Sequence, residues 1–192
     1  INSKKYAFNA KGEMLSGVQA LAMSSNTKIV GSNGIGDADK VDALKDGTLA
    51  VESYANKETK YVIGKNADTN SVNVYVYYFG AGSDGAMKTG NQNIDIDGDM
   101  YAFSFGKSGS GKGRGLNEAK DTLYVNGLRI KADSDMRYQV YSKGKMLENP
   151  AEGLDDKDST YVVNTSGSIM KNKKNLKDTD DMYICTDKSG HL

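Results

Sequence analysis

A short pattern that recurs along the chain constrains the fold more than any other feature of the sequence. Each copy begins with tyrosine, any residue and an apolar residue, passes through a turn that contains glycine, and carries a second apolar residue two positions after that glycine. The copies are YAFNAKGEML from Tyr6, YYFGAGSDGAM from Tyr77, YQVYSKGKML from Tyr138, YVVNTSGSIM from Tyr161 and YICTDKSGHL from Tyr183, and YAFSFGKSGSG from Tyr101 keeps the first half. The last three copies start 23 and 22 residues apart (138, 161 and 183). A unit this short cannot bury an apolar face alone, so the sequence predicts units that pack on their neighbours.

The copies predict β-hairpins. Apolar residues alternate along residues 101–105 and along the predicted partner strand, residues 94–96. Asp97-Gly98 lies between them and suits a two-residue turn in which both residues have positive φ, and Asn126-Gly127 repeats that signal after another apolar strand.

Two apolar rows run through the copies and predict a narrow core. The first row holds the residue two after each tyrosine: Phe8, Phe79, Phe103, Val140, Val163 and Cys185. The second row holds the residue two after each loop glycine: Met14, Met87, Met146, Ile169 and Leu192. Cys185 is therefore expected to be buried, as free cysteines commonly are.

Residues 24–59 contain no copy of the repeat. Asp37 is a suitable N-cap for a short helix that carries Val41 and Leu44 on one face, and Gly47 is placed to end that helix. We therefore expect an irregular insertion with one short helix.

The predicted fold class is all-β: an elongated, solenoid-like stack of β-hairpin repeats with an irregular insertion and one short helix. We expect two parts, an N-terminal repeat plus the irregular insertion over residues 1–73 and a β-hairpin repeat array over residues 74–192. Residues 72–78 are apolar on both faces of a strand, which predicts a strand covered on two sides.

The repeat resembles the cell-wall-binding or choline-binding repeats of Gram-positive surface proteins and their relatives, the glucan-binding and clostridial toxin repeats. Its carriers are INSKKYAFNAKGEMLSG, YYFGAGSDGAMKTG followed by NIDIDGDMYAF, and LYVNGLRIKAD followed by YVVNTSGSIMKNKK, so it covers most of residues 1–23 and 74–192. The resemblance implies an extracellular attachment module of stacked β-hairpins at the cell surface or cell wall, often appended to a catalytic or toxin domain.

The chain departs from this family at the aromatic cage that holds choline. Family members carry tryptophan just before the tyrosine pair and after the terminal glycine, whereas Val76 and Asn91 stand there in the best copy, and the chain has no tryptophan. A quaternary ammonium is held by ring faces worth roughly 0.5–2 kcal/mol each, so the resemblance extends to the scaffold and not to the cage.

Composition excludes several function classes. Lys plus Arg and Asp plus Glu number 25 each, so no net positive charge indicates a nucleic acid partner. The single cysteine cannot build a disulfide framework or a thiolate metal site within one chain. No apolar run reaches the roughly 20 residues of a membrane span. The chain starts at Ile1 without an initiator methionine or signal peptide, and we expect a processed form or an excised fragment.

Two motifs suggest ligands but have simpler explanations. Residues 93–99 match the first half of a calcium loop, but the twelfth position is Ser104 where a bidentate glutamate is needed, so a hairpin turn is favoured. Residues 106–113 are one residue away from a phosphate-binding loop, but Gly113 replaces the serine or threonine that would bind magnesium. We interpret them as a glycine-rich insertion, and we predict no metal site and no cofactor.

A catalytic apparatus is not indicated. The only histidine, His191, falls at an outward position of its copy, and Cys185 has no positioned base in the sequence. The carboxylate pairs Asp155-Asp156 and Asp180-Asp181 precede strands and fit exposed turns better than a glycosidase site. We therefore predict a protein without enzymatic activity in this segment; an enzyme with a site in residues 24–59 is the least favoured hypothesis.

Tyrosines are the candidate ligand-binding residues. They can stack on the sugar rings of a cell-wall polymer or glycan, or fill the core, as cross-strand aromatic pairs do. The set is Tyr77, Tyr78, Tyr101, Tyr138, Tyr141, Tyr161 and Tyr183. The leading hypothesis is non-catalytic attachment to the envelope, and the alternative is a structural stalk or oligomerisation module, such as a homodimer, that presents a neighbouring domain.

Overall fold

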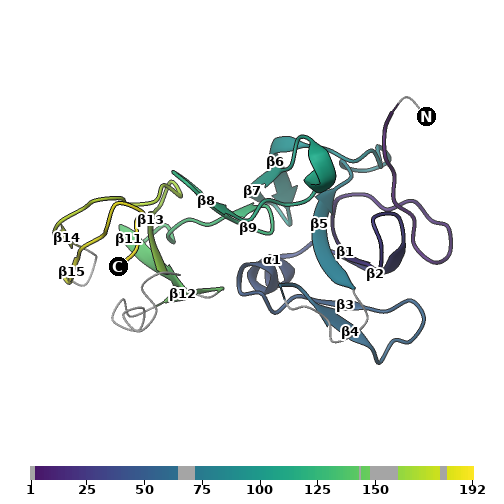
Figure 1. Cartoon of the computed structure of the whole chain (residues 1–192), viewed down its shortest axis with the longest axis horizontal. Coiled ribbons are helices and arrows are strands. Elements are labelled where there is room, and N and C mark those ends of the chain that lie inside the picture. Colours follow the sequence, from purple (N-terminus) through teal and green to yellow (C-terminus); the bar gives the residue numbers. More distant parts are fainter. Residues whose placement is uncertain (1–2, 65–71, 143, 148–159, 178–180) are drawn as a thin grey trace. The chain divides into compact units, whose positions relative to one another are not determined.

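The computed structural model describes residues 3–64, 72–142, 144–147, 160–177 and 181–192 (Figure 1). These residues form small antiparallel sheets and, within that part of the chain, one α-helix, so the all-β class is confirmed. The chain forms two compact units, one of Ile1–Leu116 with Asn126–Leu128 and one of Asn117–Val125 with Arg129–Leu192. The predicted boundary after residue 73 falls within a strand, β5, and stays a prediction.

A three-stranded sheet forms the centre of the first unit (Figure 1). It holds β1 (Val18–Met23), β2 (Ile29–Gly34) and β5 (Asn73–Tyr78) in the order β2-β1-β5. β1 and β5 pair antiparallel along their full length, from Val18 opposite Tyr78 to Met23 opposite Asn73. β5 carries buried residues on both faces, Val76 on one and Tyr77 on the other, which confirms the prediction of a strand covered on two sides.

The helix was predicted correctly. α1 (Ala38–Lys45) begins after Asp37, whose Oδ1 accepts a hydrogen bond of 2.9 Å from the Lys40 amide. Val41 and Leu44 are buried, and Gly47 follows the helix with φ of 69°. After it, β3 (Ala50–Glu52) and β4 (Lys60–Val62) form a two-stranded hairpin.

The hairpin of β6 (Gly90–Ile96) and β7 (Asp99–Phe105) also matches the sequence prediction. Its turn, Asp97-Gly98, has φ of 56° and 88°, so both residues are left-handed as a primed turn requires. Asn126 and Gly127 have φ of 50° and 91° and form the second predicted turn, between β9 (Leu123–Val125) and β10 (Leu128–Arg129). A short 3₁₀ turn, η1 (Gly109–Gly111), lies in the glycine-rich insertion.

The second unit is built around the last three copies of the repeat. β11 (Tyr138–Ser142) pairs with β12 (Lys145–Leu147) on one side and with β13 (Thr160–Asn164) on the other. β14 (Leu176–Lys177) pairs with β15 (Tyr183–Ile184), and β8 (Glu118–Ala119) pairs with β9. The core cluster takes one residue from each copy: Val140, Val162 and Ile184.

In two copies the buried residue is the neighbour of the one predicted, so the observed apolar row is shifted by one residue along the strand. The rows are correct at Phe79, Phe103, Val140 and Val163, which are buried. They are wrong in the first copy, where Phe8 is 51% and Met14 41% exposed, and wrong at Cys185, which is exposed. The pleat places neighbouring side chains on opposite faces, and Ala7 and Ile184 take the buried positions instead.

Three copies share one loop structure. In the first copy Asn9 Oδ1 accepts hydrogen bonds from the amides of Lys11 and Glu13, at 2.9 and 3.0 Å. Asn164 Oδ1 accepts in the same way from the amides of residues 166 and 168. Asp187 Oδ1 accepts from the amides of residues 189, 190 and 191. An Asn or Asp side chain therefore closes each of these three turns, because its short side chain places an oxygen within reach of backbone amides a few residues further on.

Three loop glycines face the preceding copy. A Cβ at Gly85 would overlap the Met14 side chain, and a Cβ at Gly190 would overlap the Cγ2 methyl of Ile169. Met14 and Ile169 are the second-row residues of the copies before these glycines. The same relation holds for Gly113 of the insertion and Met87 of the copy before it. At these three positions glycine lets one hairpin approach the next closely, whereas a Cβ at Gly167 would meet Arg129 and the Ile130 carbonyl, which lie outside the preceding copy.

Replacement of Gly190 by alanine is expected to lower the free energy of unfolding of the second unit. The matched control is Gly12→Ala, because Gly12 has a similar positive φ, 81° against 92°, but a Cβ added there would meet no atom within 4 Å. Alanine is strained at both sites because of the positive φ. Only at Gly190 must it also displace buried Ile169, and this lowers the free energy of unfolding by about 1–3 kcal/mol more. Urea unfolding followed by amide signals of each unit measures both losses; equal losses would contradict the close approach.

Candidate functional site

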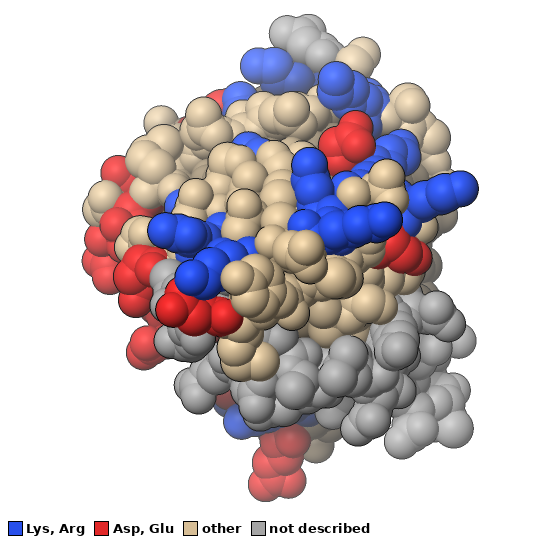
Figure 2. Space-filling view, turned by 90° about the vertical axis from the view of Figure 1, so that its left-hand side faces the viewer, with Lys and Arg blue, Asp and Glu red and all other residues tan. Residues whose placement is uncertain are grey.

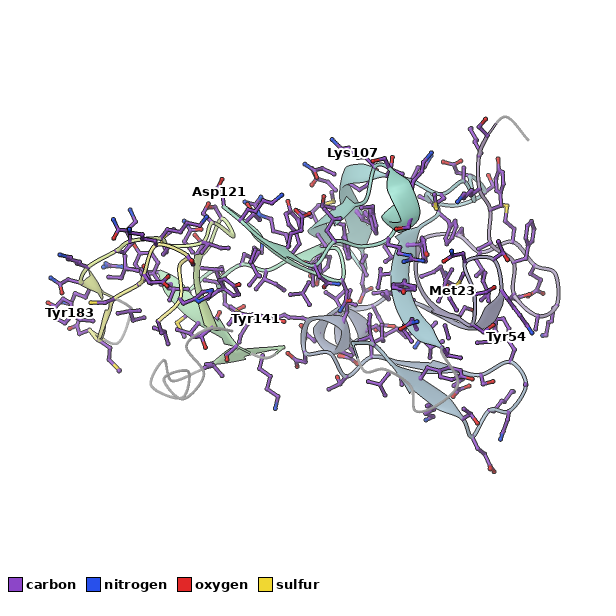
Figure 3. The ribbon with its side chains drawn as sticks, viewed as in Figure 1. Met23, Tyr54, Lys107, Asp121, Tyr141 and Tyr183 are labelled. Atoms are coloured by element: carbon purple, nitrogen blue, oxygen red, sulfur yellow. The ribbon has the colours of Figure 1, made fainter. Side chains whose placement is uncertain are left out.

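The seven candidate tyrosines do not form one site. Tyr77 and Tyr141 are buried, with 8% and 6% exposure, whereas Tyr183 is 66% exposed (Figure 3). The remaining four are partly buried: Tyr78, Tyr101, Tyr138 and Tyr161. Tyr77, Tyr78 and Tyr101 belong to the first unit and the other four to the second. The tyrosines therefore contribute to the surface and the core of each unit.

A cleft of about 480 Å³ lies in the first unit and has Tyr77 in its floor. The Tyr77 and Phe79 rings stack with their centroids 6.0 Å apart and their planes at 29°. Most of the rest of the floor is aliphatic or thioether, and Met23 is labelled in Figure 3. Its apolar and aromatic lining residues are Tyr6, Ala7, Leu21, Met23, Ile29, Tyr77, Phe79 and Met87. The first two copies of the repeat and strands β1, β2 and β5 therefore supply a floor suited to the apolar face of a ligand.

The rim of this cleft is polar and basic. Two segments supply it, one around the turn before β2 and one in the glycine-rich insertion, together with the chain before the first copy. Its polar members are Lys5, Asn26, Thr27, Ser110, Lys112 and Arg114. No aspartate or glutamate is among the described residues that line the cleft. The cleft therefore combines an apolar floor with a positive edge.

Arg114 is the most constrained group of the rim. Its guanidinium carbon lies 3.9 Å from the centroid of the Tyr75 ring, a cation–π contact. Its Nε donates a hydrogen bond of 3.3 Å to Tyr77 Oη, and its Nη2 donates one of 3.1 Å to Asn26 Oδ1. These three contacts fix the guanidinium at the edge of the cleft.

The glycine-rich insertion folds as a closed loop. The Gly106 amide donates to the Arg114 carbonyl and the Gly113 amide to the Gly106 carbonyl, both at 2.8 Å. Residues 114–119 continue through a bridge and β8 and contain no helix, so the phosphate-loop arrangement of a loop followed by a helix is absent there. The loop instead presents Lys112 and Arg114 to the cleft. In the sequence, the signal for this cationic edge is Lys112 and Arg114 between the glycines at positions 111, 113 and 115.

The second unit offers a shallow surface on its last hairpins. Tyr183 lies opposite Lys177 in the β14–β15 pair, and the His191 and Tyr161 rings form a T-shaped contact with their centroids 4.6 Å apart. Figure 2 views the molecule from the side on which β14 and β15 lie in Figure 1 and shows Lys and Arg side chains gathered over that face. Lys171 and Lys177 form ion pairs with Asp121 and Asp181, at 3.2 and 2.8 Å. Pairs this exposed contribute little to stability.

The segment predicted as irregular contains a second hollow, of about 400 Å³. Two of its polar groups already have partners: Asn33 Nδ2 donates to the Ala50 carbonyl at 2.8 Å, and Ser32 Oγ accepts from Tyr54 Oη at 2.7 Å. Its charged lining residues, Glu52 and Lys60, lie opposite each other in the β3–β4 hairpin. Among the described residues that line the hollow, the hydroxyls of Ser32 and Thr48 bond to Tyr54 and the Ala43 carbonyl and not to Glu52 or Lys60.

The segment that matches half of a calcium loop forms a hairpin turn in the structure. Residues 93–99 form the β6–β7 hairpin, in which Asp95 Oδ1 accepts a hydrogen bond of 3.1 Å from the Gly98 amide, so the turn interpretation is confirmed. Among the residues that the structure describes, no three His, Cys, Asp or Glu side chains are grouped to hold a metal ion. Asp155-Asp156 and Asp180 lie outside the described residues.

Two carboxyls and one phenol have shifted pKa values. A hydrogen bond from Lys88 lowers the pKa of Asp84, and hydrogen bonds from the backbone amides of residues 189–191, that of His191 first, lower the pKa of Asp187. Burial raises the pKa of Tyr101, and the nearby carboxylates of Asp99, Asp42 and Asp97 add to that effect. Each of these shifts has a local structural cause.

Comparisons with known proteins add no relative. No protein-family model matches the chain, and neither a curated protein nor a solved structure matches it. In the part of the chain that the structure describes, no helix has both the length and the apolar character needed to cross a membrane.

Replacement of Asp187 by alanine is expected to open the last loop, because three amides lose their acceptor. Asp187→Asn is the matched control, since Asn9 and Asn164 close the equivalent loops. Amide hydrogen exchange at residues 189–191 should accelerate in the alanine variant and stay near the wild-type rate in the asparagine variant.

The same loop should respond to acid. Because the folded pKa of Asp187 is lowered, its stabilising contribution is present above the unfolded pKa of 3.8 and is lost as the pH falls through the lower folded value. Asp187→Asn should remove that acid-induced acceleration of exchange; an unchanged acid response in this variant would contradict the assignment.

Proposed function

We propose that this chain is a non-catalytic extracellular attachment module that binds a cell-wall polymer or glycan at the surface of a Gram-positive cell. The cleft of the first unit is the observation that carries this proposal. It joins an aromatic and aliphatic floor at Tyr77 and Phe79 to a rim of hydroxyl, amide and cationic groups. A sugar ring offers the complementary surfaces, a C–H face for the floor and hydroxyls for the rim.

We further propose that successive hairpins stack in a solenoid-like array. Support comes from the glycine contacts, Gly85 on Met14 and Gly190 on Ile169, each of which joins one copy to the copy before it. The core cluster of Val140, Val162 and Ile184 likewise draws on consecutive copies. A repeated scaffold places weak sites on one molecule, and a polymeric ligand can then bind with an avidity greater than that of any single site.

A second candidate function, oligomerisation, has its own observation. Phe8 and Met14 pair across the first hairpin and are 51% and 41% exposed, and Tyr6 beside them is also exposed. A second copy of the chain could cover this apolar hairpin, as expected for a stalk or oligomerisation module. Exposed apolar clusters of this kind commonly mark interaction surfaces.

One experiment separates the two functions. Purified Gram-positive cell walls are mixed with the wild-type protein and with the double variant Phe8→Ser, Met14→Ser, and the pellet and supernatant are compared after centrifugation. Envelope attachment through the cleft predicts that both proteins enter the pellet to the same extent, because neither Phe8 nor Met14 lines the cleft.

Two outcomes would contradict envelope attachment or favour oligomerisation. Wild-type protein that stays wholly in the supernatant would contradict envelope attachment. If that protein also shows a concentration-dependent shift from monomer to dimer in sedimentation, and the double variant does not, oligomerisation is the function that the first hairpin supports.

A further inference from the structure

We propose that the ligand of the first-unit cleft is an acidic saccharide, with its carboxylate at Arg114 and Lys112 and its ring on the apolar floor of the cleft. This inference rests on the proposed function and specifies its ligand class. It is drawn from the charge, the free donors and the apolar area of one cleft.

Charge complementarity is the first argument. Lys5, Lys112 and Arg114 all line the cleft, and within the described ranges none of them forms an ion pair with a carboxylate. Other lysines of the same unit do pair, such as Lys88 with Asp84 and Lys40 with Asp37. Lys5, Lys112 and Arg114 thus place three cations, without carboxylate partners among the described residues, where a ligand would enter, and an anionic group is the ligand chemistry that they fit.

The donor geometry of Arg114 is the second argument. A guanidinium carries five N–H donors, and the contacts to Tyr77 and Asn26 use one on Nε and one on Nη2. The remaining donors on the two terminal nitrogens are available to an acceptor in the cleft. Carboxylates and phosphates are the acceptors that arginine binds with two parallel hydrogen bonds.

Preorganisation is the third argument. The Tyr75 ring and the two hydrogen bonds hold the Arg114 side chain before any ligand arrives. Most of the rotamer entropy that an arginine loses on binding is therefore already lost in the free protein. Lys112 lies on the same closed loop, two residues away, and is exposed.

The floor distinguishes a sugar acid from other anions. A polyol phosphate chain has anionic groups but no ring face to cover the apolar lining residues that are at least partly exposed, Tyr6, Ile29 and Met87. A pyranose has such a face, and Asn26, Thr27 and Ser110 lie at the rim for its hydroxyls. The volume of about 480 Å³ falls in the range typical of small-ligand pockets, which suits a short stretch of saccharide.

The test measures binding of three defined probes by titration calorimetry or by amide shifts in NMR spectra. The probes are a hexasaccharide of alternating glucuronic acid and N-acetylglucosamine, the neutral hexamer of N-acetylglucosamine, and polyglycerol phosphate. The acidic hexasaccharide should bind most tightly, and its affinity should fall as salt is added because ion pairs at an exposed rim are screened.

Three variants of the same loop provide the test, and Lys112→Gln and Lys107→Gln form its matched pair. Lys112→Gln should weaken binding of the acidic hexasaccharide by about 3- to 10-fold, and Arg114→Gln by about 10-fold or more, as expected for loss of a charged hydrogen-bond donor. Lys107→Gln, an equal change of charge on an exposed lysine that does not line the cleft, should leave binding unchanged (Figure 3). Lys112 is exposed, so its substitution tests the site even if Arg114→Gln disturbs packing.

Three results would overturn the inference. These are tighter binding of polyglycerol phosphate or of the neutral hexamer, equal effects of Lys112→Gln and Lys107→Gln, and no binding of the acidic hexasaccharide. If the protein still enters the pellet with cell walls in these cases, attachment stands and only the ligand class is wrong. Loss of wall binding as well would remove both proposals.

Discussion

The antiparallel pairing of β1 with β5 is the interaction on which the first unit depends. β1 follows the first copy of the repeat and β5 leads into the second, so their ladder brings two copies together that are far apart in the sequence. The Phe79 amide donates to the Gly17 carbonyl at 2.9 Å and the Met87 amide to the Lys5 carbonyl at 2.8 Å, which extends the contact beyond the strands. The cleft exists because of this pairing, since its floor and rim come from both copies.

Close packing at the repeat glycines gives the scaffold its second constraint. Gly85 faces Met14, whose side chain is partly exposed and can shift, whereas Gly190 faces buried Ile169, which cannot move without opening a gap. The glycine of the pattern therefore serves two purposes, a left-handed turn and a close contact. Its recurrence is explained by packing as well as by turn geometry.

Local features could be predicted from the sequence, and long-range ones could not. The Asp37 cap and the Asp97-Gly98 turn involve residues only a few positions apart, so the local sequence was enough to predict them. Cys185 was misplaced because the repeat was aligned on tyrosine, while the pleat of that copy buries Ile184 instead. An alignment shifted by one residue reverses every side chain, and spacing alone cannot detect that shift.

The candidate site shows the same limit. Tyr77 was singled out from its repeat, but its partners in the cleft include Leu21 on β1 and Arg114 in the insertion, which only the folded chain brings near it. Glycines dominate the sequence of the insertion, so its pattern favours a glycine-rich loop without a ligand. Its cations acquire a role only once the loop closes between Gly106 and Arg114.

Hydrogen exchange with and without solubilised cell-wall polysaccharide tests the central claim, that the first-unit cleft is the binding surface. The account predicts slower amide exchange at residues 5–7, 26–29 and 109–114 when the polysaccharide is present, with residues 183–192 changed less. Protection confined to residues 183–192, or no protection anywhere, would contradict it.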